Sequence, residues 1–385
     1  MTDQLENDSE DLPEQIAVRM AKREKLNDLS DAYPVSLPIT HTISEVRAEF
    51  PELEIDVATG KNVALAGRVV FARNTGKLCF ATLQSGDGER IQAMVSLDKV
   101  GEESLEQYKE LVDLGDHLFV EGEVITSKRG ELSILVSSWK MAAKTIRPLP
   151  NLHNDLSEEF RVRHRYIDLI VRDRAREVVK IRSQVMQSLR KTFAEDSYLE
   201  VETPMLQSMH GGASARPFKT HMNAFDMELF LRIAPELFLK RAVVGGLERV
   251  FEINRNFRNE GADSTHSPEF AMLESYQAYG DYNTMAELTQ KLIQNAAQDV
   301  FGTQVVKIED GEENDLSGTW DRISMFESLS AAAGVEITPE TPMAELKKIA
   351  DKVEIEIDHP LHGKYVEELW AVSYTHLRAH ETPEH

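Results

Sequence analysis

Two short runs near the middle of the chain constrain its fold more than any other part of the sequence. They are Arg255–Gly261 and Phe270–Tyr276, separated by a loop that contains His266. At the two-residue period of β-strands, the first run places Arg258 and Glu260 on one face, and the second presents one face made of Phe270, Met272, Glu274 and Tyr276. A cation, two carboxylates, an aromatic ring and a phenol then share one surface. Such a surface is unusual for a core strand and suits a ligand that carries phosphate and a base.

The length and composition indicate a cytoplasmic protein of two or more domains. At 385 residues the chain is too long for one ordinary core, and with 41% hydrophobic and 28% charged residues it is typical of soluble proteins. We expect no membrane association, because the sequence holds no run of eighteen apolar residues and its first residues are acidic where a secretory signal is basic. The single cysteine, Cys79, excludes internal disulfides and cysteine-based zinc sites. Its apolar neighbours favour a buried structural thiol over a nucleophile.

The formal charge of −23 argues against a protein that coats nucleic acid through bulk positive charge. A local basic face remains open, since residues 161–191 hold ten Lys or Arg against three acids. Two interpretations stand: an exposed helix paired with its own acids, or contact with a polyanion. The phosphate-loop, dinucleotide-binding, HExxH and Gly-x-Ser-x-Gly motifs are all absent from the sequence, so it supports neither those chemistries nor a covalent nucleophile.

Changes of pattern along the chain predict its domain organisation. Residues 1–12 are polar and expected to be disordered, and residues 13–61 form a helical segment. Residues 62–147 hold five short strands, with a helix between the third and fourth, which fits an OB-type barrel; such barrels often bind single-stranded nucleic acid. A proline-containing linker over 148–160 precedes residues 161–370, where helices and antiparallel strands mix without βαβ regularity. The expected fold class is therefore α+β.

Several motifs together resemble the bacterial class II lysyl-tRNA synthetases. The matching segments are Arg163–Ile170, Leu199–Leu206, Gly211–Phe218, Leu231–Arg241 and Phe251–Gly261, and the resemblance spans residues 13–370. It implies an OB-fold anticodon-binding domain followed by a catalytic domain built on an antiparallel sheet. It also implies ATP-dependent activation of L-lysine and transfer of the lysyl group to tRNA(Lys), with Mg²⁺ as a cofactor. A homodimer is implied through the first class motif, which ends at Pro204.

The resemblance assigns roles to residues that already stood out. Activation needs no protein nucleophile, because the lysine carboxylate attacks the α-phosphorus of ATP; the protein supplies positioning and charge neutralisation. Arg258 is the catalytic residue implied, gripping the α-phosphate and the carboxylate. The implied ATP contacts are Arg258, Glu260, His266 and Phe270. The implied lysine contacts are Gly212, Glu236, Arg258, Glu274 and Tyr276. The implied anticodon contacts are Arg73, Phe80, Gln92 and Glu131.

Structural alternatives exist for these residues. Arg258 and Glu260 could form an exposed ion pair contributing less than about 1 kcal/mol, and Phe270 or Phe80 could belong to a core. Glu274 most favours lysine over aspartate or asparagine, since a substrate with two ammonium groups needs carboxylates. The competing functions are an aspartyl- or asparaginyl-type synthetase and a non-catalytic tRNA-binding module.

The sequence also departs from the family. The third class motif, with its second ATP-binding arginine, and the acidic strand that would carry the Mg²⁺ ligands are missing, so we expect no metal site in this chain. Residues 371–385 resemble the translation of a sequencing-library adapter, and we interpret them as an artefact despite three histidines there. We therefore expect a truncated ligase with little or no activation activity and, because its sheet has an unpaired edge, poor solubility.

Overall fold

The computed structural model describes residues 12–150, 156–263, 265–307, 311–352, 357 and 361–381. The acidic segment 1–11 lies outside the described residues, as do the side chains from 372 onward, so the predictions for both ends of the chain are not addressed. The chain divides into two compact units, residues 1–183 and 184–385, and each is considered by itself.

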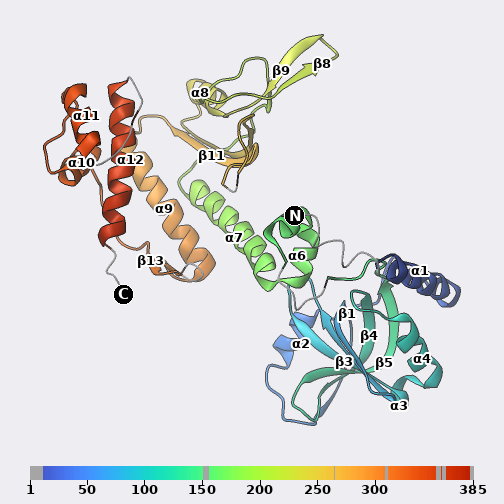
Figure 1. The fold of residues 1–385 in the computed structure, drawn as a ribbon. Helices are drawn as coiled ribbons and strands as arrows, with labels where there is room; N and C mark the ends of the chain where they lie inside the picture. The colour runs from blue at the N-terminus through green and yellow to red at the C-terminus, as the bar shows by residue number, and fades with distance from the viewer. Residues whose placement is uncertain are drawn as a thin grey trace. The chain divides into compact units, whose positions relative to one another are not determined.

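Unit 1 is built around a closed five-stranded barrel (Figure 1). Its strands are β1 (Ala58–Asn74), β2 (Leu78–Gln84), β3 (Arg90–Ser96), β4 (His117–Thr126) and β5 (Leu132–Ala143), in the order β1-β2-β3-β5-β4. Neighbouring strands are antiparallel except β3 and β5. Two short helices, α3 (Leu97–Val100) and α4 (Glu102–Leu111), lie between β3 and β4 in sequence. The OB-type barrel predicted from the sequence is confirmed.

Alternation along β2 shows how the sequence specifies the inside of the barrel. Cys79, Ala81 and Leu83 are fully buried in the barrel core, whereas Phe80 and Thr82 point to the opposite face and are half-buried. Burial raises the pKa of the Cys79 thiol, in keeping with a structural role. The alternative in which Phe80 belongs to the core is excluded.

Helices α1 (Leu12–Leu29) and α2 (Ile43–Glu49) precede the barrel. Thr42 and Glu45 form a capping box at the start of α2, which satisfies backbone donors that a helix end otherwise leaves unpaired. A buried charge cluster joins α1 to the barrel. Lys144 is fully buried, and its Nζ lies 2.5 Å from Asp113 Oδ2, while Lys22 of α1 lies 2.7 Å from Asp113 Oδ1.

Three helices follow the barrel: α5 (Glu158–Arg163), α6 (Arg165–Val171) and α7 (Asp173–Glu195). They carry the basic stretch, and many of its cations pair locally. The buried carboxylate of Asp168 accepts from both Arg165 and Arg172, and Arg163 lies 2.9 Å from Glu159. Local pairing therefore explains much of this stretch, although not all of it.

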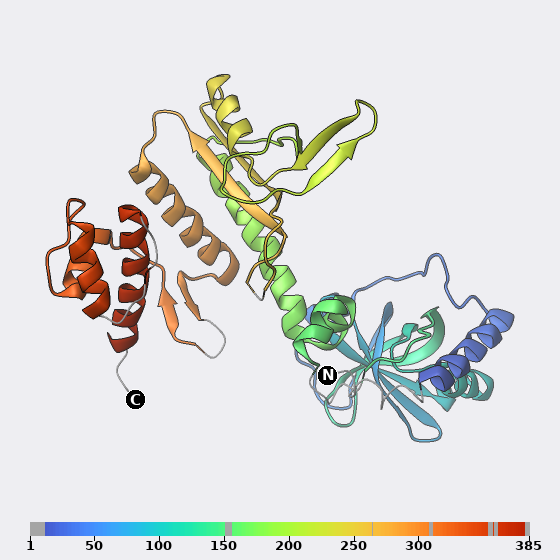
Figure 2. The ribbon, with the colours of Figure 1, turned by 45° about the horizontal axis from the view of Figure 1, so that its top comes forward.

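Unit 2 contains a strand pair at the predicted place, but its first strand ends at Phe257, so the prediction that Arg258 and Glu260 lie on a strand face is wrong. β10 (Arg249–Phe257) and β11 (Glu269–Gln277) are antiparallel, and the two-residue β6 (Leu199–Glu200) pairs in parallel with β10. A second small sheet has the order β7 (Leu206–Gln207), β9 (Met227–Leu231), β8 (Lys219–Met222). Helix α8 (Glu236–Val244) contacts β10 and β11. On the other face, α9 (Tyr282–Phe301) and the end of α7 pack against the pair through Phe193, Phe251 and Leu292 (Figure 2).

The rest of unit 2 is a hairpin and three helices. The hairpin is β12 (Val305–Lys307) with β13 (Glu313–Asp315), and the helices are α10 (Met325–Ala333), α11 (Met343–Lys352) and α12 (His362–Glu381). These helices enclose their own core, which includes Leu329, Leu346 and Leu369. Within the described ranges, none of the helices combines the length and apolar character needed to cross a membrane.

Candidate functional site

The register of β10 and β11 fixes which side chains share the outer face of the pair. Glu252 lies opposite Glu274, Asn254 opposite Met272, and Asn256 opposite Phe270. The other face is apolar and buried, with Phe251 in the core. A shift of the strand register by one residue would exchange the two faces. Burial of the apolar face therefore fixes which side chains lie on the polar face.

Arg258 follows directly on β10 and lies over an aromatic ring. Its backbone N–H donates to the carbonyl oxygen of Pro268 at 2.9 Å, which extends the ladder, and its guanidinium carbon lies 5.1 Å from the centroid of the Phe270 ring. The Nε of Arg258 is buried and has no hydrogen-bond partner among the described residues. Because an unpaired buried donor costs free energy, this atom favours the approach of an acceptor.

Glu260 does not pair with Arg258, so the ion-pair alternative has no support among the described residues. Glu260 Oε1 instead accepts from the backbone N–H of Arg216 at 3.3 Å, and the N–H of Asn259 donates to the Arg216 carbonyl at 2.8 Å. These bonds hold two loops on either side of an open pocket of about 720 Å³. The pocket is next in sequence to Arg258 and large enough for a nucleotide fragment.

His266 is exposed on the loop between the two strands. Its Nδ1 lies 3.0 Å from both carboxylate oxygens of Asp263, which also accepts from the N–H of Thr265 at 2.7 Å. These hydrogen bonds, led by the backbone bond from Thr265, hold the pKa of Asp263 well below its usual range. The described contacts tie His266 to its own loop rather than to the other predicted residues.

Gly212 and Glu236 meet closely, although they are distant in sequence. Gly212 has φ +87°, and a Cβ added there would lie 2.8 Å from the Cβ of Glu236. Only glycine fits without a shift of its neighbours. Glu236 begins α8, and its Oε1 accepts from Lys240 Nζ at 2.6 Å.

Glu274 and Tyr276 lie together on the polar face of the strand pair. The phenol of Tyr276 donates to Glu274 Oε2 at 3.2 Å. Burial raises the pKa of Glu274, and the neighbouring carboxylate of Glu236 adds to the rise, whereas the Tyr276 hydrogen bond opposes it. Burial, and then the charge of Glu274, also raise the pKa of Tyr276. A cationic ligand at this place would stabilise the ionised carboxylates of Glu236 and Glu274.

The sequence did not reveal that Glu252, which lies on the polar face, forms a buried ion pair with Arg232. Arg232 and Glu252 are almost fully buried, with Nη1 2.6 Å from Oε1, and Glu252 also accepts from the Thr203 hydroxyl at 2.6 Å. The signal was a lone arginine inside the apolar run Leu229–Ile233, because such a charge needs a buried partner. Lys240, which binds Glu236, was also missed.

The barrel carries a separate pocket of about 950 Å³. All four residues predicted to contact an anticodon line it: Arg73, Phe80, Gln92 and Glu131. The strand register explains this, since Arg73 lies opposite Phe80 and Gln92 lies opposite Ser133, whose hydroxyl donates to Gln92 Oε1 at 3.1 Å. A half-buried aromatic ring beside hydrogen-bonding groups can stack on a base and read its edge.

The same pocket has additional basic residues that the sequence analysis did not single out. Arg90, Lys128 and Arg129 also line it. The Arg129–Gly130 turn was visible in the sequence, but only the barrel brings it to the outer face of β2. Elsewhere, the carbonyl of Pro204 accepts from Gln207 Nε2 at 3.2 Å, and the dimer role of Pro204 stays a prediction.

Comparisons with known proteins match both parts of the chain. A family model described as "tRNA synthetases class II (D, K and N)" matches residues 157–376, and one described as "OB-fold nucleic acid binding domain" matches residues 63–142. The lysine–tRNA ligase of Kineococcus radiotolerans is 60% identical over 373 residues, covering 96% of this chain and 75% of that protein. The lysine–tRNA ligase 1 of Mycobacterium tuberculosis is 55% identical over 370 residues, covering 94% and 73%. The lysylphosphatidylglycerol biosynthesis bifunctional protein LysX of Mycolicibacterium vanbaalenii is 43% identical over 389 residues, covering 99% and 34%.

Proposed function

The chain belongs to the class II lysine–tRNA ligases, a family that uses ATP, and we propose that its two pockets divide that work. The outer face of β10 and β11 would bind ATP and L-lysine. The barrel pocket would bind the anticodon of tRNA(Lys). The two relatives named above that align with this chain over most of their own length are lysine–tRNA ligases. The alternative of an aspartyl- or asparaginyl-type synthetase is therefore not supported.

The reaction places a simple demand on the catalytic face. A lysine carboxylate oxygen attacks the α-phosphorus of ATP and pyrophosphate leaves; a ribose hydroxyl of the tRNA then attacks the lysyl carbonyl and AMP leaves. Negative charge gathers around one phosphorus, so a fixed guanidinium is the most useful protein group. Arg258 suits that role, because its guanidinium lies close to the Phe270 ring and its buried Nε has no hydrogen-bond partner among the described residues.

The remaining ATP contacts follow the sequence-based assignments. Glu260 would accept from the adenine amino group, and the pocket beside it has room for the base. Phe270 is half-buried next to Arg258, so a base stacked on its ring stays close to the guanidinium. His266 would approach the terminal phosphates from its exposed loop.

One observation carries the choice of lysine as the amino acid. Burial raises the pKa of Glu274, and the carboxylate of Glu236 adds to the rise. A ligand with two ammonium groups neutralises both carboxylates, whereas aspartate would add negative charge to them. In this arrangement Glu236 binds the α-ammonium, Gly212 leaves room for the substrate backbone, and Glu274 with Tyr276 faces the side chain.

Mg²⁺ and dimerisation concern groups that are not in this structure. In the described part of the chain, no three His, Cys, Asp or Glu residues are arranged to hold a metal ion. No step above depends on Mg²⁺, and its use by this chain stays a proposal drawn from the family. Homodimerisation through the segment around Pro204 belongs to the same proposal.

Equilibrium binding of free amino acids by calorimetry tests the proposal directly. The wild-type chain should bind L-lysine and not L-aspartate. Glu274→Gln should weaken lysine binding by roughly 10- to 100-fold, because it removes a charge-assisted hydrogen bond. Glu340→Gln, at an exposed glutamate of unit 2, is the matched control and should bind lysine as the wild type does. Equal affinities for lysine and aspartate, or an unchanged Glu274→Gln variant, would contradict the proposal.

A further inference from the structure

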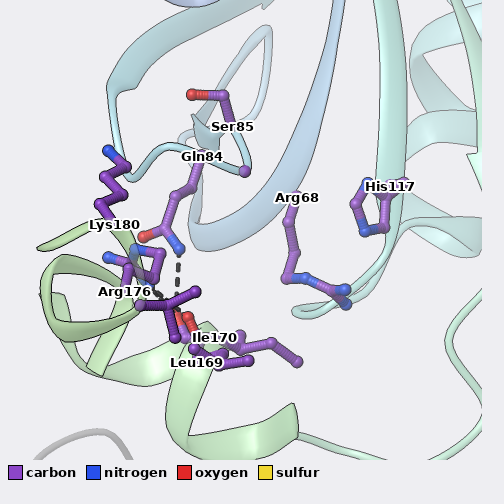
Figure 3. A pocket seen from close by; sticks show the side chains of 10 residues that line it. Arg68, Gln84, Ser85, His117, Leu169, Ile170, Arg176 and Lys180 are labelled. Atoms are coloured by element: carbon purple, nitrogen blue, oxygen red, sulfur yellow. Dashed lines mark hydrogen bonds between the residues drawn. The ribbon is translucent and has the colours of Figure 1, made fainter. Parts of the chain in front are cut away.

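A second recess in unit 1 lies between the barrel and helices α6 and α7. It has a volume of about 360 Å³, and its lining includes the basic residues Arg68, Arg176 and Lys180 together with His117 (Figure 3). None of the described residues that line it is Asp or Glu. In a chain with 66 acidic and 43 basic residues, a recess with this lining is a strong departure from the average charge.

Arg68 is the basic residue of the recess whose charge a bound anion would neutralise. Its side chain is half-buried, and Nη1 donates to the carbonyl oxygen of Gly115 at 2.8 Å. Within the described ranges no carboxylate lies within ion-pair distance of Arg68; the nearby Asp116 is bound to Lys144 at 2.7 Å. Burial accordingly lowers the pKa of Arg68. A partly desolvated guanidinium without a counter-ion favours an anion.

The other basic groups divide into structural and available ones. Arg176 is buried and donates to the carbonyl of Ile170 at 3.0 Å and to Asp173, so it is committed to the helices. Lys180 is exposed at the rim, where its Nζ donates to the carbonyl of Asp87 at 2.8 Å. Burial, and then Arg68, lower the pKa of His117 to about 4, so its ring is neutral at pH 7 and offers a hydrogen bond without a charge.

The recess lies next to the barrel pocket along one strand. Phe80, Thr82 and Gln84 alternate along β2 on the same side; the first two line the barrel pocket and Gln84 lines the recess. Gln84 also joins the two, because its Oε1 accepts from Arg90 Nε at 3.0 Å and its Nε2 donates to Ile170 at 3.0 Å. The separation from Phe80 to Gln84 is about 13 Å at the rise of a β-strand, which a few nucleotides can span.

We propose that this recess binds a backbone phosphate of the tRNA whose anticodon bases occupy the barrel pocket, with Arg68 and Lys180 as its contacts. The inference rests on the proposed function, since it takes tRNA as the ligand of the barrel. The guanidinium fork of Arg68 matches phosphate oxygens, and Lys180 adds an exposed positive charge at the rim. The position of the recess next to the barrel pocket favours an RNA strand over free phosphate.

The salt dependence of tRNA binding tests the proposal with the full chain. The affinity for a tRNA(Lys) transcript is measured over a series of NaCl concentrations for the wild type and for Lys180→Gln and Arg68→Gln. Each substitution should reduce the slope of log affinity against log salt by about one and weaken binding on the order of fivefold. Lys140→Gln, at an exposed lysine of β5 outside both pockets, is the matched control and should leave the slope unchanged.

Each other outcome has a definite meaning. Wild-type slopes in both variants would overturn the proposal, and exposed Lys180 keeps that result decisive even if Arg68→Gln folds poorly. Thermal stabilisation by inorganic phosphate that Arg68→Gln abolishes, with unchanged tRNA slopes, would mean that the recess takes free phosphate, again overturning it. Phe80→Ala should weaken binding by roughly tenfold whatever happens at the recess, since it removes a stacking platform. Failure of the wild type to bind tRNA would overturn this proposal and the proposed role of the barrel pocket, whereas the lysine site is tested separately by the calorimetric experiment.

Discussion

At the scale of single residues, ionisation of Glu274 should control lysine binding. Burial and the carboxylates of Glu236 and Glu252 raise its pKa above the ordinary value of 4.5, while Tyr276 and Arg232 oppose the rise. Both ammonium groups of lysine keep their charge across the acidic range. Lysine affinity should therefore fall as the pH drops through the raised pKa, and calorimetric titrations from neutral to mildly acidic pH would show the loss.

The raised pKa of Glu274 affects the free energy of unfolding in the opposite direction from lysine binding. The folded chain holds the Glu274 proton more tightly than the unfolded chain does, so this residue's contribution to the free energy of unfolding is present at acid pH. It is lost as the pH rises through the folded-state pKa. Glu274→Gln should accordingly raise the melting temperature at neutral pH and flatten the pH dependence of lysine binding. A variant that keeps the wild-type pH dependence would show that another group titrates.

The residues that the sequence identified correctly as neighbours are those that lie on one strand pair. Phe270, Glu274 and Tyr276 share a face because the strand period is two, which is legible without a structure. Asn256 and Arg232 were not recognised, since their importance depends on burial: Asn256 is fully buried, and its Oδ1 has no hydrogen-bond partner among the described residues. Burial of a polar group by distant segments leaves no local pattern.

At the scale of elements, the Arg232–Glu252 pair should hold the small sheet of β7–β9 to β10. Arg232 follows β9, and its Nε also donates to the carbonyl of Arg255 at 2.9 Å. Arg232→Met leaves the charge of Glu252 buried without a counter-charge, and we expect a loss of about 3–5 kcal/mol in the free energy of unfolding. Scanning calorimetry would follow the transition of unit 2.

Two further variants separate charge pairing from packing. Arg232→Met combined with Glu252→Leu should recover most of the loss, because no buried charge then remains. Arg255→Met alters an exposed arginine on β10, 3.7 Å from Glu269, and should cost less than about 1 kcal/mol. Equal losses for Arg232→Met and Arg255→Met would mean that the buried ion pair contributes no more to the free energy of unfolding than the exposed one does.

Element type was more predictable than element length. The residues Tyr198–Glu202 have a strand pattern, but only Leu199 and Glu200 form β6. Pro204, which has no N–H to donate, follows closely and limits the pairing of this segment with β10. By contrast, β1 begins at Ala58, before the apolar alternation that marks it in the sequence, because its first residues pair with β4.

At the scale of the whole molecule, the sequence could not show which distant segments meet. Gly212 contacts Glu236, and Gln84 bonds to Ile170, across long stretches of chain. The family motifs supplied the first relation, because the motif residues were assigned to one ligand. Nothing supplied the second, since Gln84 lies in none of the family motifs and no ligand was assigned to the motif that ends at Ile170. The recess beside the barrel is therefore visible only once α6 and α7 are placed against β2.

The sheet of unit 2 ends on β11, and this edge should make the chain self-associate. The strand order is β11-β10-β6, and no described strand pairs with the far edge of β11, which leaves a row of backbone donors and acceptors open. Sedimentation velocity should show association that grows with concentration. Ala271→Lys places a charge at an exposed position of β11 and should reduce the association, whereas Ala194→Lys, at an exposed position of α7, should not. An equal effect of both substitutions would indicate that net charge, rather than the open edge, governs association.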